Sequence, residues 1–142
     1  MKKQAYAILL IAALLATVLT SAQAQSDRLI TASLPFNFVI KDRALPAGEY
    51  VFALVQLGGS DAIKIQSADG HITGFVPTRS ARAKASQAEP KLVFNRYGDQ
   101  YFLSQVWGLG DSMQQVAKPR AEDRVAKSAT ERSNVSIAAL NK

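Results

Sequence analysis

Hydrophobic and polar residues alternate in short runs between residues 29 and 109, which is the spacing expected of β-strands. The clearest run has an apolar side chain at every second position, at Leu34, Phe36, Phe38 and Ile40. Because successive side chains of a strand point to opposite faces of the sheet, this run predicts a strand with one buried face. Pro35 lacks a backbone N–H and therefore favours an edge strand or the first residues of a strand.

Turn-forming residues separate the further strand-like runs. Turns are predicted at residues 46–48, 58–61, 69–70 and 98–99. Asp-Gly at 69–70 is the strongest short hairpin signal, because both residues tolerate the turn's backbone angles. The chain is therefore expected to be mainly β, as a single antiparallel β-sandwich or small barrel of about six to seven strands. The β domain is predicted to cover residues 25–110.

The pattern changes after residue 110. All aromatic residues except Tyr6 lie between Phe36 and Trp107, so residues 111–142 are predicted to be a basic polar tail outside the core. Within the tail, Pro119 followed by two acidic residues is typical of a helix start. The tail is thus expected to be part helical, with a disordered end over residues 133–142.

The start of the chain is apolar without alternation. Lys2 and Lys3 precede an uncharged run over residues 5–20, and the small residues Ala22 and Ala24 follow. This order is typical of a secretory signal peptide over residues 1–24, cleaved after Ala24. A transmembrane anchor is the alternative, but the run is shorter than the roughly 20 apolar residues of a span. The mature protein is expected in the periplasm or secreted, with no transmembrane span.

Composition and charge narrow the functions available. The 142-residue chain has no cysteine and one histidine, His71, which excludes disulfides, thiolate metal sites and any Ser-His-Asp triad without His71. Loss of Lys2 and Lys3 lowers the net charge from +6 to +4. Residues 79–90 are rich in Arg and Lys, lack large apolar side chains and predict a solvated basic loop.

The positive charge also bears on the partner. Nucleic acid is not expected for an exported protein, although charge alone permits it. Envelope polysaccharide, anionic lipid headgroups or another envelope protein are the expected partners. A solvated tail that only improves solubility is the alternative.

The densest group of chemically versatile side chains lies around the turn at residues 98–99. Its members are Arg96, Tyr97, Asp99, Tyr101 and Trp107. As a ligand site, the aromatic rings would stack on a sugar or planar ligand while the charged side chains supply hydrogen bonds. As structure, the rings would fill the core and the arginine would pair with the aspartate across the turn. Regular alternation favours the core, since it places Tyr101, Leu103 and Trp107 on one face.

The remaining titratable residues predict no catalytic residue, metal site or cofactor. His71 follows a predicted hairpin turn, and a metal would need two or three more ligands beside it. The aspartates at predicted turns are Asp42, Asp61, Asp69, Asp99 and Asp111. Turn aspartates usually hydrogen-bond their own backbone. The protein is therefore expected not to be an enzyme, the alternative being a small secreted hydrolase that uses turn carboxylates.

Two sequence blocks carry a resemblance. They comprise residues 34–50, which end in LPAGEY, and residues 91–107, KLVFNRYGDQYFLSQVW. Together with the signal peptide and the charged tail, they resemble a group of small uncharacterised secreted proteins of acidobacterial type. Lys41-Asp42 stands where the group usually has a glycine. The resemblance implies export and supplies no catalytic residue, so the expected function is a non-catalytic binding or structural accessory module of the cell envelope.

Overall fold

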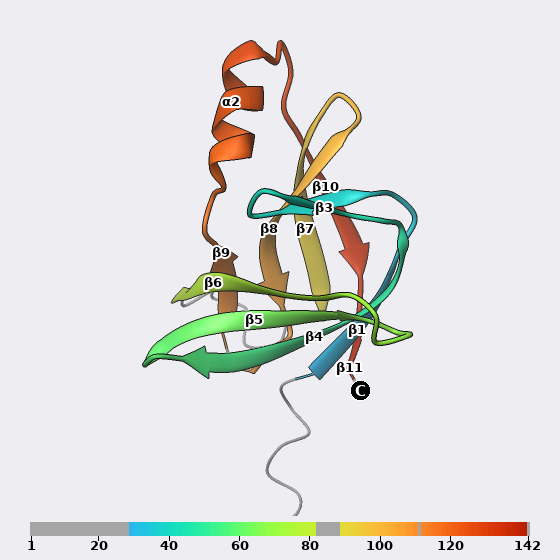
Figure 1. Ribbon diagram of the computed structural model, residues 1–142, viewed down its shortest axis with the longest axis vertical. Coiled ribbons are helices and arrows are strands. Elements are labelled where there is room, and N and C mark those ends of the chain that lie inside the picture. The colour runs from blue at the N-terminus through green and yellow to red at the C-terminus, as the bar shows by residue number, and fades with distance from the viewer. Residues whose placement is uncertain (1–28, 82–88, 111, 142) are drawn as a thin grey trace, which may run out of the picture.

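The computed structural model describes residues 29–81, 89–110 and 112–141 of the chain (Figure 1). The predicted signal peptide with Ala22 and Ala24, and the turn residue Asp111, lie outside the described residues.

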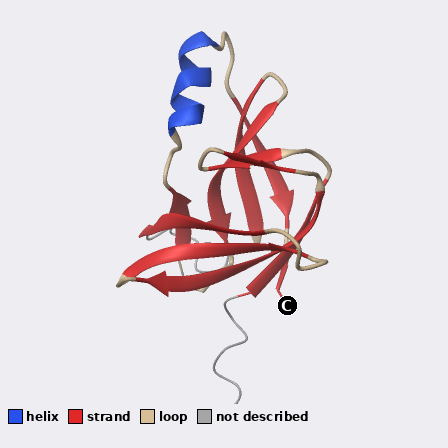
Figure 2. Ribbon diagram, viewed as in Figure 1, coloured by secondary structure: helices blue, strands red, loops and turns tan. Residues whose placement is uncertain are grey.

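Strands make up most of the described chain, as the hydrophobic alternation predicts, and a single helix lies at one end (Figure 2). In chain order the elements are β1 (Leu29–Leu34), β2 (Phe38–Ile40), β3 (Arg43–Leu45), β4 (Gly48–Leu57), β5 (Ser60–Ser67), β6 (Thr73–Ala81), β7 (Lys91–Tyr97), β8 (Gln100–Trp107), β9 (Met113–Val116), α2 (Arg120–Ser128), β10 (Ser133–Ala138) and β11 (Leu140–Asn141).

The strands form one sheet in the order β10-β7-β8-β9-β6-β5-β4-β1-β11, with β2 pairing to β3 and, in parallel, to β8. The described residues form 11 strands rather than six or seven, and the strand pairing follows an open path, so neither the sandwich nor the small barrel is confirmed. The prediction fell short because the segment 29–45 divides into three strands and the tail supplies three more.

The two predicted hairpins are confirmed. β5 and β6 pair antiparallel, with Ile63 opposite Val76, and Gly70 in their turn has a positive φ of 77°. β7 and β8 pair in the same way around Gly98, whose φ is 59°. Both glycines adopt a backbone conformation that other residues rarely take, which explains why the turns occur there.

The tail takes part in the sheet. The prediction of a disordered end is wrong, because Ser133–Ala138 forms β10 and pairs antiparallel with β7. Ile137 packs against the core from this strand, and buried Ala139 separates β10 from β11, which pairs with β1. The predicted helix is confirmed as α2, with Pro119 as its N-cap and two acidic residues in its first turn.

The core lies between two halves of the sheet whose strands run in different directions. In Figure 1, β4, β5 and β6 cross the lower part of the view, whereas β7 to β10 run up it. Both halves supply fully buried side chains, among them Phe52, Ile63 and Ile65 from the first, and Leu92, Phe94 and Val106 from the second. One face of each half therefore points inward, and α2 covers part of the opposite face of the second half.

Candidate functional site

A β-bulge decides which side chains of β8 point outward. Phe94 pairs with Leu103 but Val93 pairs with Gln105, so Ser104 is an extra residue in β8. An extra residue reverses the alternation of the strand beyond it. The expectation that Trp107 shares a face with Leu103 is therefore wrong, because Leu103 is in the core while Trp107 lies opposite Lys91 on the outer face.

The predicted ligand group around the turn does not form one patch. Arg96 lies opposite Tyr101, its guanidinium carbon 5.5 Å from the ring centroid, and its Nε donates to the Gly98 carbonyl over 2.8 Å. The Tyr101 ring stacks on Phe36 at 3.8 Å. Asp99 is exposed at the turn and, within the described ranges, forms no ion pair with Arg96. These contacts are those of a packed hairpin end.

Trp107 is separated from that end of the hairpin. It lies six residues beyond Tyr101 along β8, which corresponds to roughly 20 Å of strand. The structure therefore brings Arg96 and Tyr101 together and leaves Trp107 apart from both.

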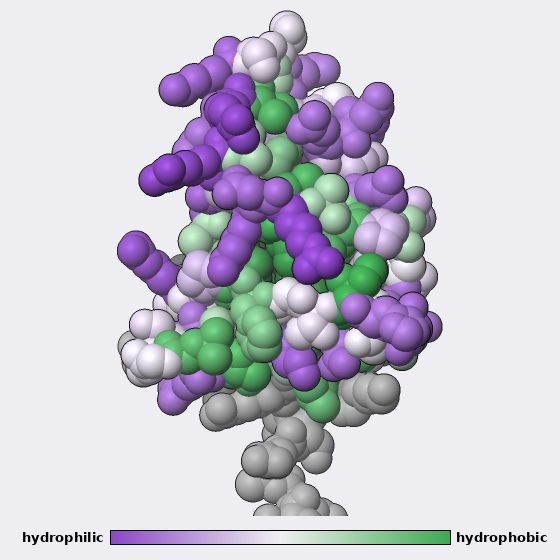
Figure 3. Space-filling model, in the orientation of Figure 1, coloured by the Kyte–Doolittle hydropathy of each residue, from purple (hydrophilic) through white to green (hydrophobic). Residues whose placement is uncertain are grey.

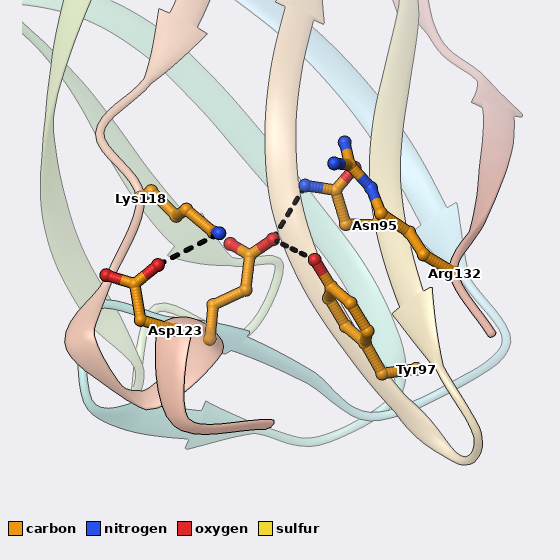
Figure 4. A network of polar contacts seen from close by, with 6 residues as sticks. Asn95, Tyr97, Lys118, Asp123 and Arg132 are labelled. Atoms are coloured by element: carbon orange, nitrogen blue, oxygen red, sulfur yellow. Dashed lines mark hydrogen bonds and ion pairs between the residues drawn. The ribbon is translucent and has the colours of Figure 1, made fainter. Parts of the chain in front are cut away.

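Tyr97 faces the helix side of the hairpin, where it joins a buried polar network (Figure 4). The Glu122 carboxylate of α2, 1% exposed, accepts hydrogen bonds from the Asn95 side-chain amide at 2.7 Å and from the Tyr97 hydroxyl at 3.1 Å. Arg132 donates to Asn95 Oδ1 over 3.0 Å. Burial, followed by the hydrogen bond to Glu122, raises the pKa of the Tyr97 hydroxyl. The network fixes α2 to β7 by polar contacts.

Sequence reasoning missed Glu122, which it treated only as one of the acidic residues of a helix start. The sequence does contain one indication that Glu122 is buried. It lies three residues before Val125, so the two side chains are neighbours on the same side of the helix. Nearby, Lys118 forms an ion pair with Asp123 at 2.9 Å, and this hydrogen bond raises the pKa of the Lys118 ammonium. Figure 3 shows hydrophilic side chains gathered over α2, so the helix exposes its charged side to solvent.

The outer face beyond the bulge carries a row of linked polar side chains. The indole N–H of Trp107 donates to Gln105 Oε1 at 3.1 Å, and Lys91 Nζ lies 4.9 Å from the centre of the indole ring. Gln105 Nε2 lies 3.5 Å from Gln115 Oε1, and Gln115 Nε2 donates to the Ser104 carbonyl at 3.1 Å. Trp107 is neither buried in the core nor fully exposed, and its ring is oriented by these partners.

A pocket of about 500 Å³ continues this row on β6 and β9. Its lining residues are Pro77, Thr78, Arg79, Gln115, Val116, Ala117 and Lys118. Arg79 pairs with Gln115 across the two strands and is exposed. It was predicted to lie in a basic loop, but β6 extends through Ala81, because pairing with β9 continues the strand. We call Arg79, Lys91, Gln105, Trp107, Gln115 and Lys118 the Trp107 face.

A buried amide supports the Trp107 face from the inner side. Gln114 is 0% exposed, accepts from the Thr78 hydroxyl at 3.1 Å and donates to Ser80 Oγ at 2.9 Å. It also donates to Ser112 Oγ at 3.1 Å. These bonds hold β9 against β6, and so they hold Gln115 and Arg79 in place on the opposite side of the same strands.

The turn carboxylates are used locally. The carboxylate of Asp69 accepts from the Ser67 hydroxyl and, at 3.0 Å, from the His71 backbone N–H, and these bonds lower its pKa. Asp61 accepts from Ser80 at 3.0 Å, and Asp42 is exposed in the β2–β3 turn. In the part of the chain that the structure describes, no three histidine or acidic side chains lie close enough together to hold a metal ion.

Comparisons with known proteins do not assign a function to this chain, so its function is inferred from the geometry of the site. No family model, curated protein or solved structure matches the chain. None of the described ranges contains a helix long and apolar enough to cross a membrane.

Proposed function

We propose that this chain is an exported, non-catalytic binding module of the cell envelope, present in the periplasm or secreted, and that its Trp107 face binds an acidic polysaccharide. The proposal of export is supported by the order of basic, apolar and small residues over residues 1–24. The proposal of binding is supported chiefly by one observation: a partly exposed indole is linked through Gln105 to Gln115, with Lys91 over its ring and Arg79 opposite Gln115.

The side chains of the Trp107 face suit the chemistry of an acidic sugar. An aromatic ring packs against the apolar face of a sugar ring, and glutamine amides both donate to and accept from hydroxyl groups. Arg79 and Lys91 supply the positive charge that a carboxylate or sulfate group requires, and Lys118 lines the same pocket while paired with Asp123. The pocket volume of about 500 Å³ falls within the range typical of small-ligand sites.

Anionic lipid headgroups fit the Trp107 face less well. Binding to a bilayer surface gains much of its strength from apolar side chains that enter the lipid. Among the described residues, the exposed large hydrophobic side chains are Leu57, Phe75 and Leu140, and none of them belongs to this face. A hydrated polymer that lies along the strands requires no such insertion.

The test is calorimetric titration of the protein with polygalacturonate, with neutral dextran as the control polymer. Binding of the acidic polymer is expected to weaken as salt rises from low to physiological concentration, because exposed charges are screened over about 8 Å there. Trp107→Ala and Arg79→Gln are each expected to weaken binding about tenfold, which corresponds to about 1.4 kcal/mol.

The matched control is Arg43→Gln, which removes one exposed cation from β3, outside the Trp107 face. It is expected to bind like the parent protein. Equal losses in Arg43→Gln and Arg79→Gln would show that only net charge matters and would contradict the assigned face. Release of new reducing ends from the polymer would contradict the non-catalytic proposal and support the turn-carboxylate hydrolase.

A further inference from the structure

The outward face of the other half of the sheet is unusually apolar. The register of β11, β1, β4, β5 and β6 places one set of side chains on this face, and these strands turn their alternate residues into the core. We call the apolar members of the outward set the β4 face: Leu29, Val51, Ala53, Val55, Leu57, Ala62, Phe75, Pro77 and Leu140.

Exposure singles out the β4 face from the rest of the described surface. The exposed large hydrophobic side chains of the described residues are Leu57 (50%), Phe75 (41%) and Leu140 (75%), and all three lie on it. Single exposed apolar side chains are ordinary, but a contiguous apolar face on one side of a sheet marks an interaction surface. Glu49 and Lys64 are charged side chains that the register adds to this face, and Arg79 follows Phe75 and Pro77 on the same side of β6.

We infer that the β4 face is the contact between two copies of this chain, packed face to face about a two-fold axis that runs along β4. β4 is the middle strand of the five, with β1 and β11 on one side and β5 and β6 on the other. Its outward residues from Val51 to Leu57 form an unbroken apolar row. A two-fold axis along this row brings each of these residues against its own copy, as a self-complementary contact requires.

The flanking strands complement one another under the same symmetry. Rotation about the axis moves β5 and β6 of one copy over β1 and β11 of the other. Phe75 lies in the same cross-strand row as Leu29, and Leu140 lies in the next row. Phe75 of one copy therefore meets Leu29 and Leu140 of the other, while Leu57, which belongs to the axis row, meets its own copy.

The dimensions of the β4 face agree with a weak dimer. Five strands about 4.8 Å apart, and six residue steps of about 3.3 Å from Val51 to Leu57, give a patch roughly 20–25 Å wide and 20 Å long. This is about half of the roughly 800 Å² that each partner contributes to a standard interface, and interfaces of that size are typical of weak, transient contacts.

Sedimentation of the purified full chain at concentrations from about 1 to 200 μM tests the inference. The protein is expected to shift from monomer to dimer as its concentration rises through this range, and Phe75→Lys is expected to raise the dissociation constant by at least about tenfold. The β4 face adjoins the Trp107 face, because Pro77 lines the pocket and Phe75 lies on the same side of β6 as Arg79, so binding of acidic sugar is tested separately on variants of the Trp107 face. The matched control is Thr130→Lys, which adds the same single charge at an exposed position beside α2 and is expected to dimerise like the parent.

The absence of cysteine from the chain allows a second measurement that locates the axis. Val55→Cys places one thiol on the axis row, and a short bis-maleimide is expected to cross-link it to its own copy. Asn134→Cys, exposed on β10, is expected not to cross-link. A monomer at every concentration, or equal cross-linking of the two cysteine variants, overturns the inference. A monomer that binds phosphatidylglycerol vesicles through Phe75 also overturns it and assigns the face to lipid.

Discussion

Replacement of Glu122 by alanine tests how α2 is held to the sheet. The carboxylate is 1% exposed and accepts hydrogen bonds from Asn95 and Tyr97 at 2.7 and 3.1 Å. Alanine leaves both donors buried without an acceptor. A buried donor that loses its partner costs about 1–3 kcal/mol, and disruption of a buried charged network costs about 3–5 kcal/mol in total. We therefore expect Glu122→Ala to lower the free energy of unfolding by about 3 kcal/mol.

Two further substitutions at the network sharpen the expectation. Glu122→Gln keeps an oxygen that can accept from Asn95 and Tyr97, so its cost is expected to be about 1 kcal/mol. Tyr97→Phe removes one of the two hydrogen bonds and is also expected to cost about 1 kcal/mol. Comparison of the three losses in unfolding free energy thus separates two effects. Glu122→Gln removes the charge but keeps an acceptor, whereas Glu122→Ala removes both.

Urea unfolding, followed by the fluorescence of the single tryptophan and by far-ultraviolet circular dichroism, measures these costs. Hydrogen exchange of residues 120–128 reports whether α2 is released before the sheet unfolds. Glu131→Ala removes an exposed carboxylate near the same helix and is expected to stay within about 0.5 kcal/mol of the parent. If Glu122→Ala also stays within about 0.5 kcal/mol, and exchange in α2 is unchanged, the polar attachment of the helix is refuted.

The remaining predictions concern a tryptophan, a turn and a glycine. Trp107→Ala is expected to cost about 1–2 kcal/mol in urea unfolding, below the roughly 3–5 kcal/mol of a fully buried tryptophan, and a larger loss would place the indole in the core. The lowered pKa of Asp69 means that its contribution to stability is present above the ordinary carboxyl pKa and is lost as pH falls through the lowered value. Asp69→Asn is therefore expected to show a smaller fall in Tm between about pH 4 and pH 2 than the parent, and an equal fall would contradict this. Gly108→Ala is expected to cost about 1–3 kcal/mol, because its φ is 92° and a Cβ would lie 2.8 Å from the Pro90 backbone. Gly110→Ala, at φ 82° with open space around it, is expected to cost less, and thermal unfolding compares the two.

Features that depend on a few adjacent residues were predicted from the sequence. The hairpins at Gly70 and Gly98 follow from local turn chemistry, and the start of α2 follows from a proline and nearby acidic residues. The bulge at Ser104 could not be predicted, because it depends on how β7 pairs with β8. That single extra residue moved Trp107 from the predicted core face to the outer face.

The strands of the tail also could not be predicted from the sequence, because they depend on contacts between residues far apart in the chain. Val135 and Ile137 alternate with small or polar residues, a pattern too short to indicate a strand without a partner. β10 forms because β7 offers an unpaired edge to it. Burial of Glu122 likewise depends on Asn95 and Tyr97, which are 27 and 25 residues away in the chain. Residues so distant in sequence give no local signal of their contact.

The measurement that tests the central claim most directly is a nuclear magnetic resonance titration of the ¹⁵N-labelled protein with a short oligogalacturonate. The indole N–H of Trp107 and the side-chain amides of Gln105 and Gln115 each give a resolved reporter on the proposed face. We predict that these signals shift together and saturably, while the amides of the hairpin end near Tyr101 and of β1 and β4 stay unchanged. Shifts confined to those other regions, or no shift at millimolar ligand, would contradict it.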